Sequence, residues 1–211
     1  MSFDVDVRKT IGDRLIEARF TAPGGLTVLW GPSGAGKTSV LNMVAGLLRP
    51  DEGHIRVRDE TLFDAGRAID RPVHRRRLGY VFQDGRLFPH LRVRANLLYG
   101  HRLADPKDRW ISFAEVVDFL GIGALLDRWP RSLSGGEAQR VAIGRALLSG
   151  ARALLLDEPL ASIDLDRRSG IIDVILRIRD ELALPMLYVT HDPVEAERLA
   201  TRRVEITPSS R

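Results

Sequence analysis

Residues 31–38 carry the pattern in this chain that is best suited to chemistry, GPSGAGKT. Its three glycines allow a loop in which successive backbone N–H groups point at the oxygens of a phosphate. Lys37 adds a positive charge toward the outer phosphates, and the hydroxyl of Thr38 is a suitable ligand for Mg²⁺. The pattern predicts a phosphate-binding loop, whereas a chance Gly-rich turn is the alternative. The expected phosphate contacts are Gly31, Pro32, Ser33, Gly34, Ala35, Gly36, Lys37, Thr38 and Ser39.

Two acidic residues, Asp157 and Glu158, directly follow the apolar run ALLL. A strand with this sequence delivers both carboxylates to the edge of a sheet where ligands bind. Asp157 suits the shell of a Mg²⁺ ion, and Glu158 could polarise a water molecule for attack on a γ-phosphate. The alternative for an isolated Asp-Glu pair is a helix N-cap, and the phosphate-binding loop in the same chain favours the catalytic interpretation.

Residues 133–137, LSGGE, form a second Gly-rich segment. Ser134 and Glu137 match a capping box, which predicts that a helix begins here. A capping box does not require glycine at positions 135 and 136. Gly135 and Gly136 leave the helix N-terminus open to an anion. Ser134 can cap this helix and still donate a hydrogen bond to a phosphate.

The elements that must position these residues follow from the pattern of apolar residues. The N-terminal residues alternate loosely around Gly12-Asp13, which predicts a hairpin. The helix after the phosphate-binding loop is expected over 39–45 with its end near 47–48, and the basic segment 71–77 is expected to be a solvated turn. Further strands are expected at 26–30, 54–58, 61–63, 78–82, 153–157 and 185–191, and further helices at 113–126, 134–147 and 168–182. Short apolar strands alternating with helices predict an α/β fold with a mainly parallel sheet covered by helices on both sides, plus an N-terminal antiparallel β portion.

Composition limits the possible functions. The 211 residues include no cysteine, which excludes disulfides and thiolate metal sites. The chain has no run of about 18 apolar residues and no signal peptide, so we expect a cytosolic protein that meets a membrane only through a partner. The net charge of +4 raises the question of nucleic acid, but the arginines are spread along the chain and favour a solvated basic surface. We therefore expect no nucleic-acid partner.

Together these motifs resemble the ATP-binding-cassette (ABC) ATPases, which have a P-loop NTPase core. Lys37 lies in the phosphate-binding loop, Gln83 matches the Q-loop, and residues 133–137 match the family signature. Asp157 and Glu158 match the Walker B motif, Asp164 the D-loop, and His191 the switch histidine. Order and approximate spacing agree from about residue 5 to residue 206.

The resemblance implies a division of roles. The implied ligands are ATP and Mg²⁺. Thr38, Gln83 and Asp157 would surround the metal, and the catalytic residues would be Glu158, His191 and Gln83. It implies a homodimer closed by ATP, in which Ser134, Gly135, Gly136 and Asp164 of one subunit face the nucleotide of the other. It also implies one ABC ATPase domain over 1–211, with a nucleotide-binding core lobe at 1–84 and 151–211 and an inserted helical signature subdomain at 85–150. A membrane permease would dock near 85–100.

A narrower resemblance, to molybdate-import ATPases, is carried by residues 78–100, 125–128 and 185–189. It implies uptake of molybdate, with tungstate as a near-isostere, at the cytoplasmic face of the inner membrane. A periplasmic oxyanion-binding protein would be an indirect partner. The chain departs from this pattern twice. It has no aromatic residue at 8–11 to stack on adenine, and we expect the C-terminal oxyanion-binding regulatory domain to be absent.

Three other functions stay open. ATPases of sulfate, phosphate or other small-solute importers share every catalytic motif named above. A soluble cassette ATPase acting on nucleic acid is disfavoured, because the chain lacks the coiled-coil insertion or second cassette of such proteins. A non-catalytic binding module is disfavoured by the presence of Lys37, Asp157 and Glu158 together.

Overall fold

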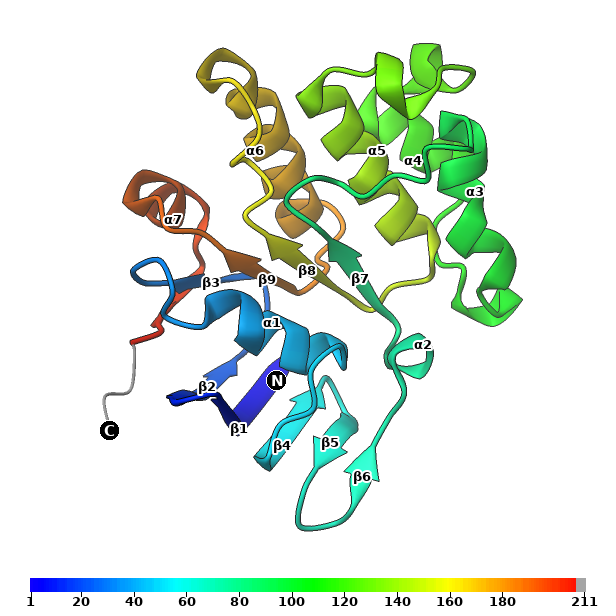
Figure 1. Ribbon diagram of the computed structural model, residues 1–211. Helices are drawn as coiled ribbons and strands as arrows, with labels where there is room; N and C mark the ends of the chain where they lie inside the picture. The colour runs from blue at the N-terminus through cyan, green and yellow to red at the C-terminus, as the bar shows by residue number, and fades with distance from the viewer. Residues whose placement is uncertain (208–211) are drawn as a thin grey trace. The chain divides into compact units, whose positions relative to one another are not determined.

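The computed structural model describes residues 1–207, without the side chains of residues 165–167. The chain forms two compact units (Figure 1). The first contains Met1–Arg76 and the chain from Ala183 onward, and the second contains Arg77–Leu182. Residues 208–211, which belong to the predicted core lobe, lie outside the described part of the chain.

An antiparallel sheet opens the first unit. The hairpin expected around Gly12-Asp13 is confirmed, because β1 and β2 pair in register from Phe3↔Ala22 to Ile11↔Arg14. Phe3, Val5 and Val7 alternate with more exposed neighbours and point into the core, as the period of a strand requires. The sheet runs in the order β2-β1-β4-β5-β6, with β1 (Phe3–Ile11), β2 (Arg14–Ala22), β4 (Glu52–Val57), β5 (Glu60–Asp64) and β6 (Ile69–Asp70).

Three parallel strands and three helices complete the first unit. β3 has β9 on one side and β10 on the other, all three parallel. Helix α1 packs between this layer and the antiparallel sheet, where it contacts β9 and β2 (Figure 1). Their bounds are β3 (Leu26–Trp30), β9 (Met186–Val189), β10 (Arg202–Glu205), α1 (Lys37–Ala45), α2 (Val73–Arg76) and α7 (Pro193–Leu199).

Helix α1 corrects one prediction, because it starts two residues before Ser39 and ends at Ala45 instead of near 47–48. Gly46 takes a left-handed conformation, φ 83°, and its N–H caps the carbonyls of Asn42 and Met43. A left-handed glycine directly after the last turn is a common way to end a helix.

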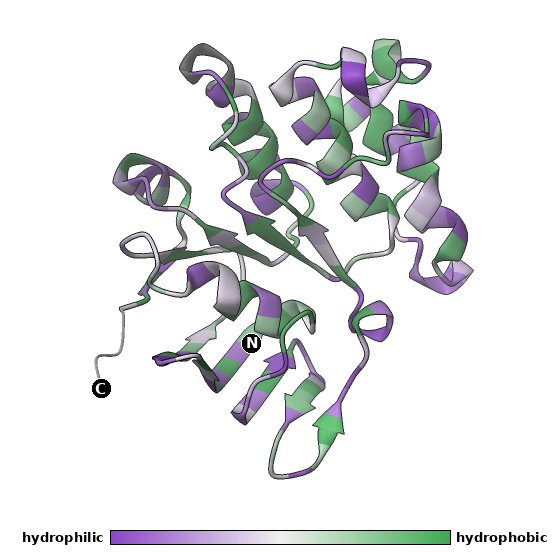
Figure 2. Cartoon of the chain, viewed as in Figure 1, coloured by the Kyte–Doolittle hydropathy of each residue, from purple (hydrophilic) through white to green (hydrophobic). Residues whose placement is uncertain are grey.

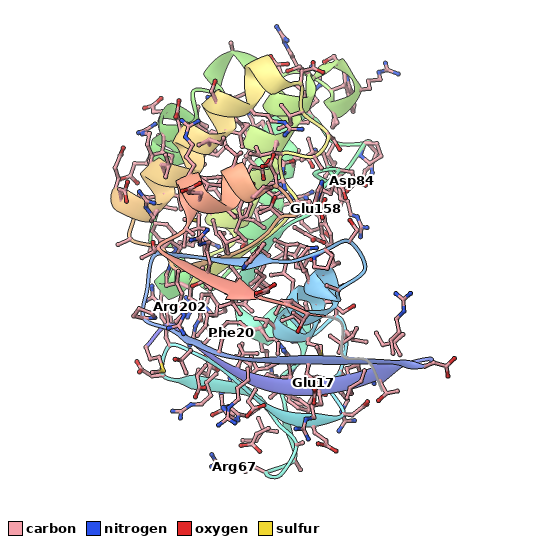
Figure 3. All side chains as sticks on the ribbon, turned by 90° about the vertical axis from the view of Figure 1, so that its left-hand side faces the viewer. Glu17, Phe20, Arg67, Asp84, Glu158 and Arg202 are labelled. Carbon is pink, nitrogen blue, oxygen red and sulfur yellow. The ribbon has the colours of Figure 1, made fainter. Side chains whose placement is uncertain are left out.

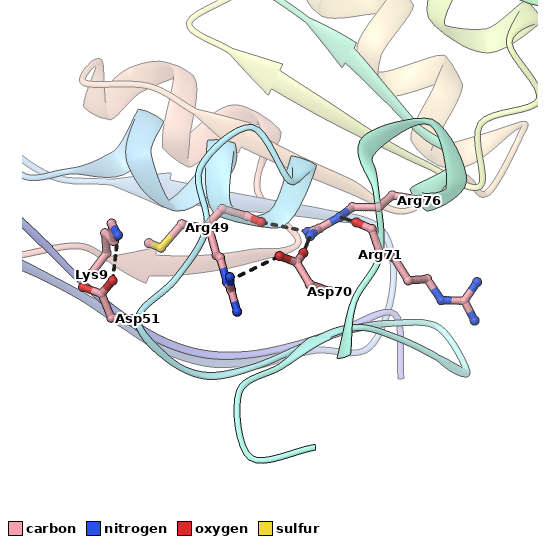
Figure 4. A network of polar contacts seen from close by, with 7 residues as sticks. Lys9, Arg49, Asp51, Asp70, Arg71 and Arg76 are labelled. Carbon is pink, nitrogen blue, oxygen red and sulfur yellow. Dashed lines mark hydrogen bonds and ion pairs between the residues drawn. The ribbon is translucent and has the colours of Figure 1, made fainter. Parts of the chain in front are cut away.

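Arg76 corrects a second prediction, because it is not part of a solvated turn. Its side chain is 1% exposed. The guanidinium donates to the carbonyl oxygens of Met43 and Val44 at 3.0 and 2.9 Å. It also donates to the carbonyl oxygen of Arg71 at 2.8 Å (Figure 4). It also pairs with Asp70 at 3.0 Å. Arg76 thus binds the end of α1 to the segment that follows β6, and its charge is favourable at a helix C-terminus.

The second unit contains two parallel strands and a cluster of helices around α5. β7 and β8 pair from Leu78↔Ala153 to Val81↔Leu156. Helix α5 contacts α3, α4, α6 and β7. Figure 2 shows β8 almost uniformly hydrophobic, and its first four residues are fully buried, as expected for a strand covered on both faces. The bounds are β7 (Leu78–Val81), β8 (Ala153–Asp157), α3 (Val93–Leu103), α4 (Phe113–Leu120), α5 (Gly135–Leu148) and α6 (Leu165–Asp180), with short 3-10 turns at Pro106–Asp108, Gly123–Leu125 and Pro130–Ser132.

Most predicted elements of the second unit are confirmed, and one helix is shorter than expected. The helix predicted over 113–126 ends at Leu120, because Gly121 adopts a left-handed conformation with φ 63° and caps it. The helix predicted over 168–182 begins earlier and ends earlier, at Leu165–Asp180. Parallel strands with helices, together with the N-terminal antiparallel sheet, confirm the predicted α/β class.

Candidate nucleotide site

The phosphate-binding loop joins β3 to α1 in the first unit. Gly31 and Gly36 have φ of 148° and 96°. A Cβ atom on Gly31 would lie 2.3 Å from the carbonyl oxygen of Ile206, and one on Gly36 would lie 2.9 Å from the side chain of Ile16. Both positions therefore require glycine for space as well as for conformation. Gly36 is also the N-cap of α1, and no side chain caps the first backbone N–H groups of this helix.

Lys37 is the buried cation of this loop, with 5% of its surface exposed. Its Nζ atom donates to the carbonyl oxygens of Gly31 and Pro32 at 2.8 and 2.9 Å, which places the ammonium group across the loop. Thr38 is exposed and Ser39 half-buried at the same helix end. Backbone donors, an ammonium group and a hydroxyl at a helix N-terminus form a donor set that fits phosphate oxygens with a hard cation.

His191 follows β9, the neighbour of β3 in the parallel sheet. Leu29 pairs with Val189, and the N–H of Thr190 donates to the carbonyl oxygen of Leu29 at 3.3 Å. Because parallel strands end at the same edge, His191 and the phosphate-binding loop emerge from the same edge of this sheet. His191 is exposed.

A buried carboxylate that the sequence analysis missed holds the backbone beside His191. Glu195 is 8% exposed and accepts from the hydroxyl of Tyr188 at 2.9 Å and from that of Thr190 at 2.8 Å. Asp192 caps α7 by accepting from the N–H groups of Val194 and Glu195. The pattern Asp-Pro at positions 192 and 193 is a helix-start signal that could have revealed α7.

Asp157 and Glu158 stand at the end of β8 in the second unit (Glu158 is labelled in Figure 3). Gln83 follows the parallel neighbour β7 and is exposed. Val81 pairs with Leu156, so the two strands deliver Gln83 and both carboxylates to one edge of the sheet. Glu158 has φ 44°, an uncommon conformation for a residue with a side chain and one that is frequent at functional sites.

Tyr80 is a neighbour of Asp157 that sequence reasoning did not find. Its hydroxyl donates to Oδ2 of Asp157 at 3.1 Å. Burial, together with the negative charge of Asp157, raises the pKa of Tyr80 well above its ordinary value. Tyr80 therefore stays a neutral donor to this carboxylate throughout the physiological range of pH.

Tyr80→Phe is expected to destabilise the protein by about 1 kcal/mol near pH 7, because Asp157 loses a part-buried hydrogen bond. A group whose folded-state pKa is raised stabilises fully below its ordinary pKa, about 10 for tyrosine, and the contribution falls as pH rises beyond that value. Urea unfolding at pH 7 and at pH 10.5 measures both effects. Tyr99→Phe, at a residue that is 49% exposed, is the control. Equal stabilities of Tyr80→Phe and the parent protein at pH 7 would contradict the assigned hydrogen bond.

The signature segment begins α5, and the predicted capping box is confirmed. Oγ of Ser134 accepts from the N–H of Glu137 at 3.3 Å, and the carboxylate of Glu137 accepts from the N–H of Ser134 at 2.7 Å. A Cβ atom on Gly136 would meet nothing within 4 Å, so this helix end is open. A Cβ atom on Gly135 would lie 3.0 Å from the carbonyl oxygen of Ser162, which places the D-loop segment beside the signature. Asp164 is exposed at the start of α6.

The predicted site residues thus form two groups. The phosphate-binding loop and His191 belong to the first unit. Gln83, the signature glycines, Asp157, Glu158 and Asp164 belong to the second. Thr38 is in the first unit, whereas Gln83 and Asp157, the other residues expected around Mg²⁺, are in the second.

Comparison with models of known protein families shows to which family this chain belongs. The model described as "ABC transporter" matches residues 19–161, which span the phosphate-binding loop, the signature and the Walker B motif. The chain belongs to the ABC transporter family.

Several curated relatives of this chain are named molybdenum import ATP-binding proteins. The protein of Mesorhizobium japonicum is 53% identical over 95% of this chain and 54% of its own length. Those of Rhizobium meliloti and Rhodospirillum rubrum are 51% and 52% identical over 97% and 96% of this chain, and 57% and 55% of their own lengths. The chain therefore spans little more than half the length of these relatives.

Solved structures agree on the fold. A dimeric structure of the bacterial ABC transporter cassette MJ0796 aligns with a TM-score of 0.75 at 24% identity, over 97% of this chain and 93% of that one. A second structure of the same cassette, in a post-hydrolysis state, aligns with a TM-score of 0.76 over 98% of this chain and 94% of that one. No helix in the described part of the chain is long and apolar enough to span a membrane.

Proposed function

We propose that this chain is the ATP-hydrolysing subunit of an importer that takes up molybdate, with tungstate as a near-isostere. The observation that carries this proposal is the identity of about half of all residues with molybdenum import proteins, over nearly the whole chain. ATPases of other importers share the catalytic motifs, but such motifs make up a small part of the sequence. Identity of this extent therefore supports a transporter of the same kind.

In this proposal, the phosphate-binding loop and Lys37 bind the phosphates of ATP. Glu158 accepts a proton from the attacking water, and His191 contacts the γ-phosphate. Thr38, Gln83 and Asp157 would hold Mg²⁺, which would supply positive charge to the phosphate oxygens. The hydrogen bond from Tyr80 fixes one oxygen of Asp157, which orients the carboxylate for its role.

We propose that two copies of the chain form a dimer that ATP closes. Ser134 and the open N–H groups at Gly135 and Gly136 of one subunit then contact the nucleotide of the other, and Asp164 lies beside this contact. The capping box supports this role, because it fixes the first turn of α5 while Gly136 stays uncovered. The functional division is a nucleotide-binding core lobe at 1–84 and 151–211 and a signature subdomain at 85–150.

The permease is proposed to dock on residues 85–100. Asn96 is fully buried and shapes this segment, because its side chain accepts from the N–H of Phe88 at 2.8 Å and donates to the carbonyl oxygens of Phe88 and Leu91 at 3.1 and 2.9 Å. Arg145 donates to the carbonyl oxygens of Gly85 and Arg86 at 3.0 and 2.8 Å, and its guanidinium lies 5.1 Å from the ring of Phe88.

These bonds build a loop of fixed shape that presents an aromatic group. The ring of Phe88 lies 4.5 Å from that of Tyr99 and 6.0 Å from that of His90. Pro89, His90 and Tyr99 are exposed. Aromatic residues with arginines around them are typical of protein interfaces. The subunit would thus be a peripheral protein at the cytoplasmic face of the inner membrane, and a periplasmic oxyanion-binding protein would reach it only through the permease.

Deleting the gene is expected to abolish high-affinity molybdate uptake and to leave sulfate uptake intact. Phe88→Ala is expected to lower uptake strongly while the purified subunit keeps its ATPase activity, because the substitution removes the central ring of the docking loop. Radiolabelled molybdate uptake by cells and phosphate release by the purified protein measure the two effects. Leu103→Ala, at a residue that is 77% exposed at the end of α3, is the matched control and is expected to keep both activities. Loss of sulfate uptake alone would contradict the assignment of molybdate as the transported substrate.

A further inference from the structure

The tip of the β1–β2 hairpin lies directly on the phosphate-binding loop in the first unit. The side chain of Ile16 covers Gly36, since a Cβ atom on this glycine would lie 2.9 to 3.3 Å from three of its carbon atoms. Arg14 is two residues away on the same strand and therefore on the same face. Its Nη1 atom lies 3.6 Å from the position of a Cβ atom on Gly34.

Arg14 differs from the other arginines of this hairpin. Arg8 pairs with Glu17 and Glu52, and Arg19 pairs with Asp6. Among the described residues, no hydrogen bond, ion pair or ring contact involves Arg14, and its side chain is exposed. A guanidinium group that no carboxylate neutralises therefore stands beside a loop built for phosphates.

The surroundings of Arg14 favour a flat, apolar partner. Ile11 is its cross-strand partner, and 45% of the surface of this isoleucine is exposed. Ile16 is half-buried on the other side. The loop already supplies Lys37 and backbone N–H groups for the phosphates, whereas the hairpin supplies two aliphatic side chains and one planar cation. A planar guanidinium stacks well on an aromatic ring.

We propose that Arg14, with Ile11 and Ile16 beside it, binds the base of the nucleotide whose phosphates occupy the loop. A single ribose joins base and phosphates, so the base stays within reach of a long side chain next to the loop. The inference rests on the proposed function, since it requires that the chain bind ATP.

Two ligands separate a contact to the base from a contact to phosphate. Isothermal titration of the purified chain with Mg-ATP and with magnesium tripolyphosphate, which has no base, measures both affinities. Arg14→Ala is expected to weaken ATP binding about tenfold and to leave tripolyphosphate binding unchanged. Arg14→Tyr is expected to restore ATP binding, because tyrosine also stacks on a base. Arg19→Ala, on the opposite face of β2, is the matched control and should bind both ligands as the parent protein does.

Several results would overturn the inference. An equal loss for both ligands in Arg14→Ala would assign Arg14 to a phosphate, and no loss for ATP would leave it no role in binding. Failure of Arg14→Tyr, with a melting temperature equal to that of the parent protein, would exclude stacking. A parent protein that binds neither ligand would instead refute the proposed function itself.

Discussion

Glu158→Gln is expected to lower ATP turnover about a hundredfold or more while ATP affinity stays nearly unchanged. The amide is almost the same size as the carboxylate but cannot accept the proton of the attacking water. Glu158 stands at the end of β8 in a left-handed conformation, φ 44°. Glutamate and glutamine adopt this conformation at the same energetic cost. Folding should therefore be affected little.

Single-turnover phosphate release and equilibrium binding of Mg-ATP measure the two quantities separately. Glu181→Gln, an exposed position just after α6, is the control for loss of one negative charge and should hydrolyse ATP normally. Turnover of Glu158→Gln within a few-fold of the parent protein would remove Glu158 from the proposed mechanism.

Arg76→Ala is expected to destabilise the protein by about 3–5 kcal/mol, the largest effect on stability that we predict for a single substitution. The change removes the hydrogen bond from Arg76 to the carbonyl oxygen of Val44 and one of the two hydrogen bonds to that of Met43, whose other donor is the N–H of Gly46. It also removes a fully buried side chain that packs on Gly46, where a Cβ atom would lie 2.5 Å from Nε of Arg76. Burial lowers the pKa of Arg76, with Asp70 opposing the shift, and the guanidinium stays charged at neutral pH.

Arg49→Ala is the matched control for this substitution. Arg49 lies 3.5 Å from the same carboxylate of Asp70, but 75% of its side chain is exposed (Figure 4). A surface ion pair of this kind contributes about 1 kcal/mol or less. Chemical denaturation of both variants and the parent protein should give a clearly larger loss for Arg76→Ala. Similar losses for the two variants would show that the buried contacts of Arg76 contribute little.

The contrast between Lys37 and Arg76 shows what sequence reasoning can recover. The spacing of glycines around Lys37 is dictated by local backbone geometry, so the loop, its flanking strand and its helix could be predicted. Arg76 stands in a run of basic residues that looks solvated. Its burial depends on carbonyl groups more than 30 residues earlier, which no local pattern reveals.

Local sequence patterns also fail to predict where some helices end and which residues support the site residues. The helix predicted over 113–126 contains apolar residues beyond Leu120, but Gly121 ends it. Tyr80 was not predicted because it contacts Asp157, which is distant in the chain. Glu195 was not predicted because it acts through buried hydrogen bonds that leave no local pattern. The Asp157–Glu158 pair, the capping box at Ser134 and His191 could be located from sequence, since each directly follows an apolar strand or starts a helix.

The chain leaves the first unit at Arg76 and returns to it only at Ala183. Strand β3 is therefore synthesised early, whereas both of its partners, β9 and β10, follow only after the whole second unit. The phosphate-binding loop exists as a covalent segment long before the sheet that supports it can close. Domains usually fold in the order in which they emerge, but here the second unit emerges whole before the first is complete. The sheet that supports the phosphate-binding loop can therefore form only after the second unit has been synthesised.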